Sequence, residues 1–212
     1  VYKRQNLKIA VRYTLTEDNA FRMDYRVSSD ADTIVNLTNH SYFNLDGGGD
    51  VLNQKLRLYA SNYLEGNNQT CPTGTILPVA NTPMDFTEGK LIGRDIDTGF
   101  AQTTMVGGGY DHCFVLNKHE PGELSFAAKI VEPKSGRSME VYTTEPGVQF
   151  YSDNWADGYK GQHGATFGKH SALCFEAQHF PDSPNRAYFP PVVLKPGQVY
   201  TQKTIYKFGV EE

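Results

Sequence analysis

Apolar and polar residues alternate from the first part of the chain, which predicts β-structure. Every second residue is apolar from Leu7 to Leu15, and the alternation resumes from Phe21 to Val27 after the turn Glu17–Asn19. Successive side chains of a strand point to opposite faces, so this pattern predicts a hairpin with one buried face. Similar runs predict further strands at residues 56–60, 113–116, 124–131, 138–143, 148–151, 172–175 and 199–208.

Turn-forming residues separate these runs, as at Pro72–Gly74, Gly107–Gly109 and Pro196–Gly197. A sustained helical stripe is absent from the sequence, although residues 82–94 could include a short helical turn. The expected fold class is therefore all-β, a sandwich or large open sheets with antiparallel strands. Since no linker, repeat or low-complexity tract interrupts the pattern, we expect a single domain over residues 1–212.

The first residues depart from the pattern. Val1–Gln5 do not join the alternation that starts at Leu7, and the first hairpin arrives without a preceding loop. We therefore expect the chain to begin partway through a larger fold.

Composition excludes several kinds of partner. The net charge is −4 and the basic residues are scattered, which argues against nucleic acid. An apolar run of about 20 residues, as a membrane span needs, does not occur. Cys71, Cys113 and Cys174 are widely spaced and odd in number, so free buried thiols are expected, rather than disulfides or zinc ligands. A reducing compartment, the cytoplasm, is the expected location.

His40 is the first candidate for chemistry. It lies among amides and aromatic residues between a predicted strand end and the turn Asp46–Gly49. An imidazole can exchange a proton near neutral pH, and Asn36, Asn39 and nearby side chains could bind a hydroxyl-rich ligand. The alternative is a loop histidine that braces its own turn.

Two further candidates lie on or beside predicted strands. Asp111 stands between the glycine-rich turn Gly107–Gly109 and an apolar strand, where it could bind ligand hydroxyls or close an Asx-turn. Gln149 lies between apolar neighbours and must find hydrogen-bond partners, either on an adjacent strand or on a ligand. Glu145, which precedes a proline, is expected to be solvated.

Glu176 follows the predicted strand 172–175 and precedes a proline-rich turn. If it shares a face with Ala172 and Cys174, it is partly desolvated, and its pKa should rise above about 4.3. The alternative is an ion pair with a lysine such as Lys169.

The other histidines show no metal-ligand spacing. His112 and His179 could line a pocket, whereas His119, His163 and His170 are expected at the surface. Phosphate-loop and GxSxG motifs are also absent from the sequence. We therefore expect neither a metal nor another cofactor.

Four segments together resemble the aldose 1-epimerases, also called galactose mutarotases. They occur in the family's order, and the resemblance extends over residues 6–210: Asn39–Leu45, Tyr110–His112, Thr144–Tyr151 and Cys174–Asn185.

The resemblance implies a galactose mutarotase-like antiparallel supersandwich and an isomerase that acts on free aldoses such as glucose and galactose. It implies that His40 is the general acid towards the ring oxygen and Glu176 the general base towards the anomeric hydroxyl. Asp111 and Gln149 would hold sugar hydroxyls.

One departure from the family pattern concerns the start of the chain. Family members carry an upstream His-Gly-Gly turn and an arginine that reach the substrate, and no such turn precedes His40. The chain therefore resembles roughly the last two-thirds of the family domain, incomplete at the N-terminus. This predicts an exposed apolar face or sheet edge.

Other functions are also consistent with these residues. A carbohydrate-binding module would use Asp111 and Gln149 without turnover. A glycoside hydrolase could pair Asp111 with Glu176, but this leaves the His40 segment unexplained. A sugar-phosphate epimerase would be expected to gather basic residues, and no such cluster is seen.

Overall fold

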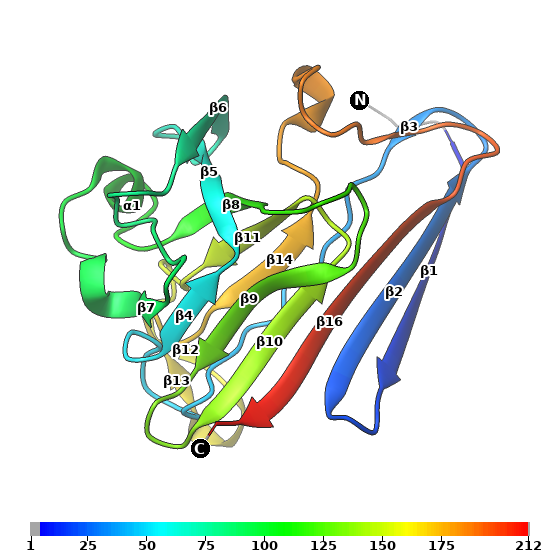
Figure 1. The fold of residues 1–212 in the computed structure, drawn as a ribbon. Helices are drawn as coiled ribbons and strands as arrows, with labels where there is room; N and C mark the ends of the chain where they lie inside the picture. Colours follow the sequence, from blue (N-terminus) through cyan, green and yellow to red (C-terminus); the bar gives the residue numbers. More distant parts are fainter. Residues whose placement is uncertain (1–4, 212) are drawn as a thin grey trace.

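The structure, a computed structural model, describes residues 5–211. Most of the first five residues, which do not join the strand pattern, therefore lie outside the described part. Two antiparallel sheets dominate the fold (Figure 1). In spatial order the larger sheet contains β1 (Leu7–Leu15), β2 (Ala20–Ser29), β16 (Tyr200–Val210), β10 (Arg137–Thr143), β9 (Ser125–Val131), β4 (Lys55–Leu58) and β7 (Lys90–Leu91).

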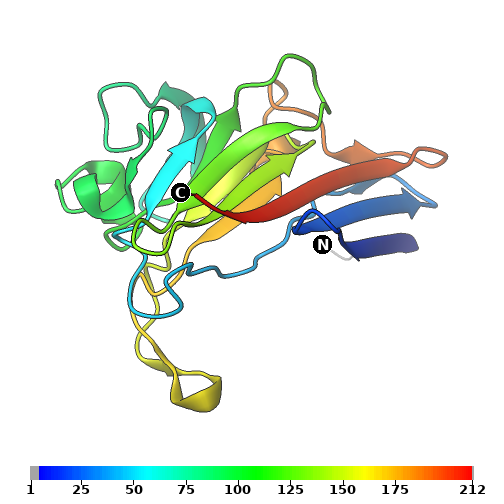
Figure 2. The same ribbon diagram turned by 60° about the horizontal axis from the view of Figure 1, so that its bottom comes forward.

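The smaller sheet carries the candidate residues. Its order is β14 (Cys174–Gln178), β11 (Gly147–Tyr151), β8 (Asp111–Leu116), β5 (Ala60–Gly66) and β6 (Pro72–Pro78). Two short ribbons complete the strands, one of β3 (Thr33–Ile34) with β15 (Val193–Leu194) and one of β12 (Tyr159–Lys160) with β13 (Thr166–Phe167). The β12–β13 ribbon, yellow in Figure 2, projects away from both sheets.

Helical structure is short. It consists of the α-helix α1 (Ala101–Met105) and the 3₁₀ turns η1 (Ile92–Asp95), η2 (Gln162–Gly164) and η3 (Ser183–Asn185). The first 3₁₀ turn begins within the segment 82–94, where a helical turn was expected. Within residues 5–211, no helix has the length and apolar character needed to cross a bilayer.

The core fills the space between the two sheets. Leu56, Ile130 and Val141 of the larger sheet belong to the same buried cluster as Phe150 and Phe175 of the smaller one. Each of these residues alternates with outward-facing neighbours, as the two-residue period of a strand requires. The expectation of an all-β antiparallel sandwich is confirmed.

Two local predictions were wrong. Pro72–Gly74 was expected to form a turn but begins β6; this strand lies at the edge of its sheet, where a proline at the first position is tolerated. The strand predicted at 172–175 instead covers Cys174–Gln178. Glu176 therefore lies within a strand rather than after it.

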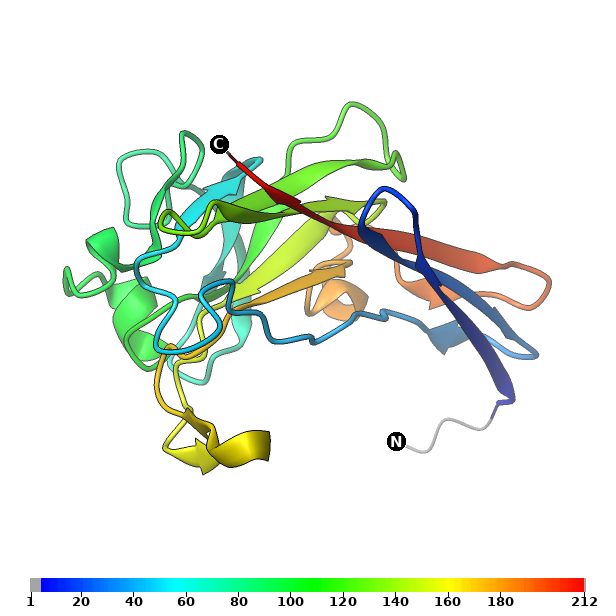
Figure 3. The ribbon, with the colours of Figure 1, turned by 90° about the horizontal axis from the view of Figure 1, so that it is seen from below.

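The first hairpin pairs as predicted, but only one of its strands is buried. Tyr13 lies opposite Met23, and Val11 lies opposite Tyr25, so the apolar residues share one face. On β2 that face is buried, whereas on β1 it is exposed, with Leu15 at 83%. The reason is the position of β1 at the edge of a sheet whose β1, β2 and β16 end extends beyond the smaller sheet (Figure 3). An exposed apolar face, also expected from the sequence, is thus present.

Candidate active site

Polar side chains line one face of the smaller sheet. Gln149 on β11 lies opposite Glu176 on β14 and opposite Cys113 on β8, so the three form a row across the sheet. The immediate neighbours of these residues along each strand point to the other face, where Phe150 and Phe175 are fully buried. Strand alternation therefore separates the apolar core from a polar surface on the opposite face.

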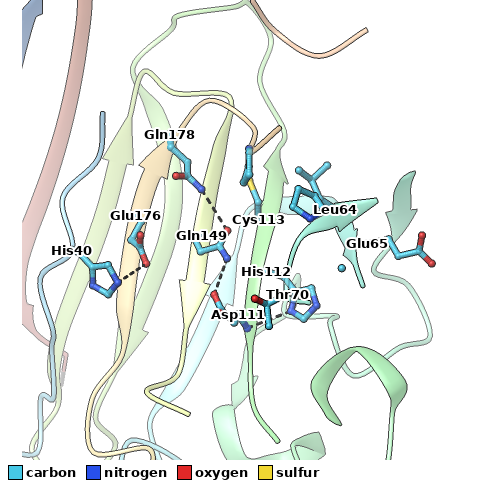
Figure 4. Close-up of a pocket in the computed structure, with 13 residues that line it drawn as sticks. His40, Leu64, Glu65, Thr70, Asp111, His112, Cys113, Gln149, Glu176 and Gln178 are labelled. Carbon is cyan, nitrogen blue, oxygen red and sulfur yellow. Dashed lines mark hydrogen bonds and ion pairs between the residues drawn. The ribbon is translucent and has the colours of Figure 1, made fainter. Parts of the chain in front are cut away.

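His40 reaches this row from a separate segment that runs beside β14. Its Nε2 lies 3.3 Å from Oε1 of Glu176 (Figure 4). The His40 side chain is 48% exposed and that of Glu176 is 13% exposed, so the carboxylate lies within the site and the imidazole at its rim. The partner of Glu176 is thus His40 and not Lys169, and His40 does not simply brace its own turn.

Aromatic rings hold the His40 imidazole. The ring stacks on Tyr42 at a centroid distance of 5.0 Å, and it meets the edge of Tyr151 at 6.1 Å. Tyr42 also meets Tyr151 edge to face. These contacts restrict the orientation of the imidazole ring.

Asp111 and Gln149 are joined to each other. Gln149 donates from Nε2 to Oδ1 of Asp111 at 2.8 Å, and its Oε1 accepts from Gln178 at 3.4 Å. The carboxylate of Asp111 is thus oriented by a neighbouring strand, and no Asx-turn bond to it is found among the described contacts. The amide group of Gln149 is fixed in orientation by the same two bonds.

The turn before β8 positions Asp111. The buried side chain of Asn154 donates to the carbonyls of Val106 and Tyr110, and Ser152 accepts from the Tyr110 amide. A Cβ at Gly109 would collide with the Asn154 side chain, so this approach of the two loops requires glycine there.

All four predicted residues line one cavity of about 320 Å³. That volume is at the lower end of the roughly 300–1,000 Å³ typical of small-ligand pockets. The cavity is also lined by residues that the sequence did not indicate: Leu64, Glu65, Gly66, Thr70, Pro72 and Pro181. Most of them belong to the β5–β6 hairpin, which was hidden because Pro72–Gly74 was interpreted as a turn.

Burial dominates the electrostatics of the two carboxyl groups. It raises the pKa of Glu176 above its ordinary value; the nearby His40 lowers it and Asp111 raises it further. Burial also raises the pKa of Asp111, against the opposing effects of the Gln149 hydrogen bond and of His40. The predicted rise for Glu176 is confirmed in direction.

The raised pKa of Glu176 makes the stability of the protein depend on pH. Because the pKa of Glu176 is raised in the folded protein, the folded state binds the proton more tightly than the unfolded chain. The resulting stabilisation is complete below the ordinary value of about 4.3 and is lost as the pH rises through the raised value. We therefore expect Glu176→Gln to raise Tm at about pH 8, with a gain that shrinks towards about pH 4.5.

Calorimetry across this range tests the prediction, with Glu17→Gln, which alters an exposed carboxylate, as the control. A gain that does not change with pH would contradict it.

Of the remaining histidines, His112 lines the same cavity, as the sequence suggested, whereas the others lie elsewhere. His112 is buried, its pKa is lowered to about 4 by desolvation, and its Nε2 lies 3.1 Å from Oε1 of Gln102. His170 was expected at the surface but is buried, with Nδ1 2.7 Å from the carbonyl of Ser152. Among the predicted free thiols, Cys113 and Cys174 are buried but Cys71 is exposed.

His179 lies outside the cavity, on a larger groove of about 1,440 Å³ beside β1, β2 and β16. Its Nδ1 is 2.6 Å from Oε2 of Glu145. Glu145, expected to be solvated, is only 2% exposed. Its carboxylate contacts the imidazole of His179 and the hydroxyl of Tyr200.

No group of three or more potential metal ligands occurs in the part of the chain that the structure describes. The described site brings together an imidazole, two carboxyl groups and an amide on one sheet of an antiparallel β-sandwich.

The chain belongs to the aldose 1-epimerase family, whose model matches residues 5–207. It is 42% identical over 207 residues to the galactose mutarotase of Mus musculus, and the match covers 96% of this chain and 58% of the relative. It is 36% identical to the aldose 1-epimerase of Escherichia coli, covering 97% of this chain and 60% of that one. The chain thus spans about 58–60% of the length of these relatives.

Among solved structures, the chain is similar to the GalM/aldose epimerase homologue of C. elegans. The TM-score is 0.87 at 30% sequence identity, and the alignment covers 97% of this chain and 61% of the other. The resemblance seen in the four sequence segments is therefore confirmed at the level of the family and the fold.

Proposed function

We propose that this site interconverts the α and β anomers of free aldoses, with hexoses such as glucose and galactose as substrates. The observation that carries the proposal is the contact between His40 and Glu176 at the rim of a small polar cavity. The names of similar proteins, galactose mutarotase and aldose 1-epimerase, support it. Because the chain spans less than two-thirds of those relatives, the activity is proposed for the site rather than transferred from them.

The geometry suits opening of a hemiacetal ring. The anomeric hydroxyl and the ring oxygen are bonded to the same carbon, so a base and an acid only 3.3 Å apart can address both. Glu176 would remove the hydroxyl proton as the C1–oxygen double bond forms. The bond from C1 to the ring oxygen breaks, and protonated His40 gives its proton to that oxygen.

Ring closure reverses these transfers. Rotation about the C1–C2 bond turns the other face of the aldehyde to the ring hydroxyl. His40 then takes the hydroxyl proton back, the ring bond re-forms, and protonated Glu176 gives its proton to the carbonyl oxygen. The raised pKa of Glu176 favours this role, because a stronger base accepts the first proton more readily.

Asp111 and Gln149 would bind the sugar hydroxyls. Their side chains are already joined and held by adjacent strands, so they would present a fixed acceptor and amide to the ligand. Pre-set groups lose little freedom on binding. No step of this scheme requires a cofactor.

Polarimetry tests the proposal. Freshly dissolved α-glucose or α-galactose should reach anomeric equilibrium at a rate that rises in proportion to protein concentration, above the spontaneous rate. Saturable binding of the sugar without acceleration would instead show a carbohydrate-binding module. Release of sugar from aryl glycosides would show a hydrolase that uses Asp111 and Glu176.

We expect Gln149→Ala to weaken binding more than it slows turnover. The substitution removes the amide and the bond that orients Asp111, and a neutral hydrogen bond contributes about 0.5–1.5 kcal/mol. KM should therefore rise about 2- to 10-fold with little change in kcat, as measured from initial rates over a range of sugar concentrations. A fall in kcat at unchanged KM would contradict this assignment.

A further inference from the structure

Hydrogen bonds join the segment that carries His40 to the two residues that flank β14, Leu173 and His179. At one end, Phe43 and Leu173 exchange two backbone hydrogen bonds of 2.8 and 2.9 Å, as in an antiparallel sheet. At the other end, the side chain of Asn36 replaces the backbone. It donates to the carbonyl of His179 and accepts from the amide of His179, both at 2.9 Å.

These hydrogen bonds at the two ends determine which residue of β14 lies opposite His40. Moving three residues back from Phe43 reaches His40, and moving three residues forward from Leu173 reaches Glu176. An antiparallel arrangement started at the Phe43–Leu173 bridge therefore places His40 opposite Glu176. Residues 37–42, which lie between these two ends, belong to no strand, so regular backbone pairing with β14 does not extend along them.

We infer that Asn36 is a positioning residue that holds His40 against Glu176. Its amide offers one donor and one acceptor to a single residue of the facing chain, as a backbone pair in an antiparallel sheet does. Without it, the N-terminal end of the segment would lose both of its hydrogen bonds to His179, the residue that follows β14. The inference rests on the proposed function for its catalytic consequence, but not for the geometry.

His179, the residue to which Asn36 is bound, is itself held in place by further contacts. The His179 ring is bound to the buried carboxylate of Glu145 at 2.6 Å. Glu145 also accepts from the hydroxyl of Tyr200, and its backbone amide donates to the hydroxyl of Thr143. The Glu145–His179 pair, which takes no part in the proposed chemistry, therefore has a role: it fixes the point to which Asn36 is tied.

A positioning role for Asn36 replaces the expectation that its amide could bind a hydroxyl-rich ligand. Both hydrogen-bonding atoms of its side chain are engaged with the backbone of His179. Asn36 acts on the site through His40 and need not touch the substrate.

Asn36→Ala in the protein as it stands tests the inference kinetically. We expect kcat to fall at least about 10-fold with KM changed less than about 2-fold, because a shift of about 1 Å between reacting groups can cost on the order of 10²-fold in rate. Asn36→Asp keeps the acceptor and loses the donor, so its kcat should fall between those of Asn36→Ala and the parent.

Asn117→Ala is the matched control. Asn117 is also an exposed asparagine with a two-bond clasp: it donates to the hydroxyl of Ser61 at 3.0 Å and accepts from the Ser61 amide at 3.2 Å. It does not line the cavity. An equal loss of kcat in this variant, or a rise in KM alone in Asn36→Ala, would overturn the inference.

NMR separates this inference from the proposed function. The ring signals of His40, assigned by their loss in His40→Asn, should move in Glu176→Gln because the ion pair is lost. They should move in the same direction in Asn36→Ala and stay in place in Asn117→Ala. If the parent protein does not accelerate mutarotation, the proposed function fails, but the His40 signals still show whether Asn36 positions His40. Unchanged His40 signals in a folded Asn36→Ala protein would overturn the inference.

Discussion

Glu176→Gln should slow the interconversion of anomers by about 10²- to 10⁴-fold, the usual contribution of a positioned base. Glutamine has nearly the same shape as glutamate and can still contact His40, but it cannot take the proton from the anomeric hydroxyl. The fold should persist, since only one carboxylate oxygen changes. Polarimetry at saturating sugar gives the rate, and circular dichroism reports the fold.

Glu65→Gln is the matched control, because Glu65 lines the same cavity but bonds to Thr73 instead of His40. Its rate should stay within about 3-fold of the parent's. A near-parental rate in Glu176→Gln would remove Glu176 from the role of base. Together with the expected gain in Tm, a large loss of rate would show that the raised pKa of Glu176 costs stability and serves the reaction.

His40→Asn should lower the rate by a similar factor, again about 10²- to 10⁴-fold. Asparagine can donate a hydrogen bond to Glu176 or to the ring oxygen but cannot transfer a proton, so it tests transfer apart from contact. The rate is measured by polarimetry, with KM obtained from the same data. KM should change little, because Asp111 and Gln149 supply the proposed contacts to the hydroxyls.

The exposed His119 provides the control, and His119→Asn should retain the parental rate. If His40→Asn raised KM strongly while kcat stayed near the parental value, His40 would be a binding group and the ring oxygen would need another acid.

The sequence predicted most of the fold because buried antiparallel strands leave a two-residue period. It also indicated Gln149, since a polar residue between Val148 and Phe150 must find hydrogen-bond partners. Glu176 was indicated in another way, by its place between an apolar strand and a proline-rich turn, although the strand end was misplaced.

Long-range pairing explains what the sequence could not show. Nothing near Glu145 indicates burial, because its partner His179 comes from a distant turn. The β5–β6 wall of the cavity was missed because an edge strand can begin with Pro72. Leu15 carries the same pattern as Met23, and only the extent of the opposite sheet decides that one is exposed and the other buried.

The row of side chains across β8, β11 and β14 divides mutational tolerance between alternate positions. Residues 111, 113, 149 and 176 face the cavity, whereas residues 114, 148, 150 and 175 face the core. Laboratory evolution of sugar preference can therefore randomise the cavity-facing set while the core-facing set is kept, so that new specificities are sampled without loss of stability. A shift of one residue in the pairing of any of these strands would exchange the two sets. Only molecules with correctly paired strands would then be active, and the measured rate would report their fraction.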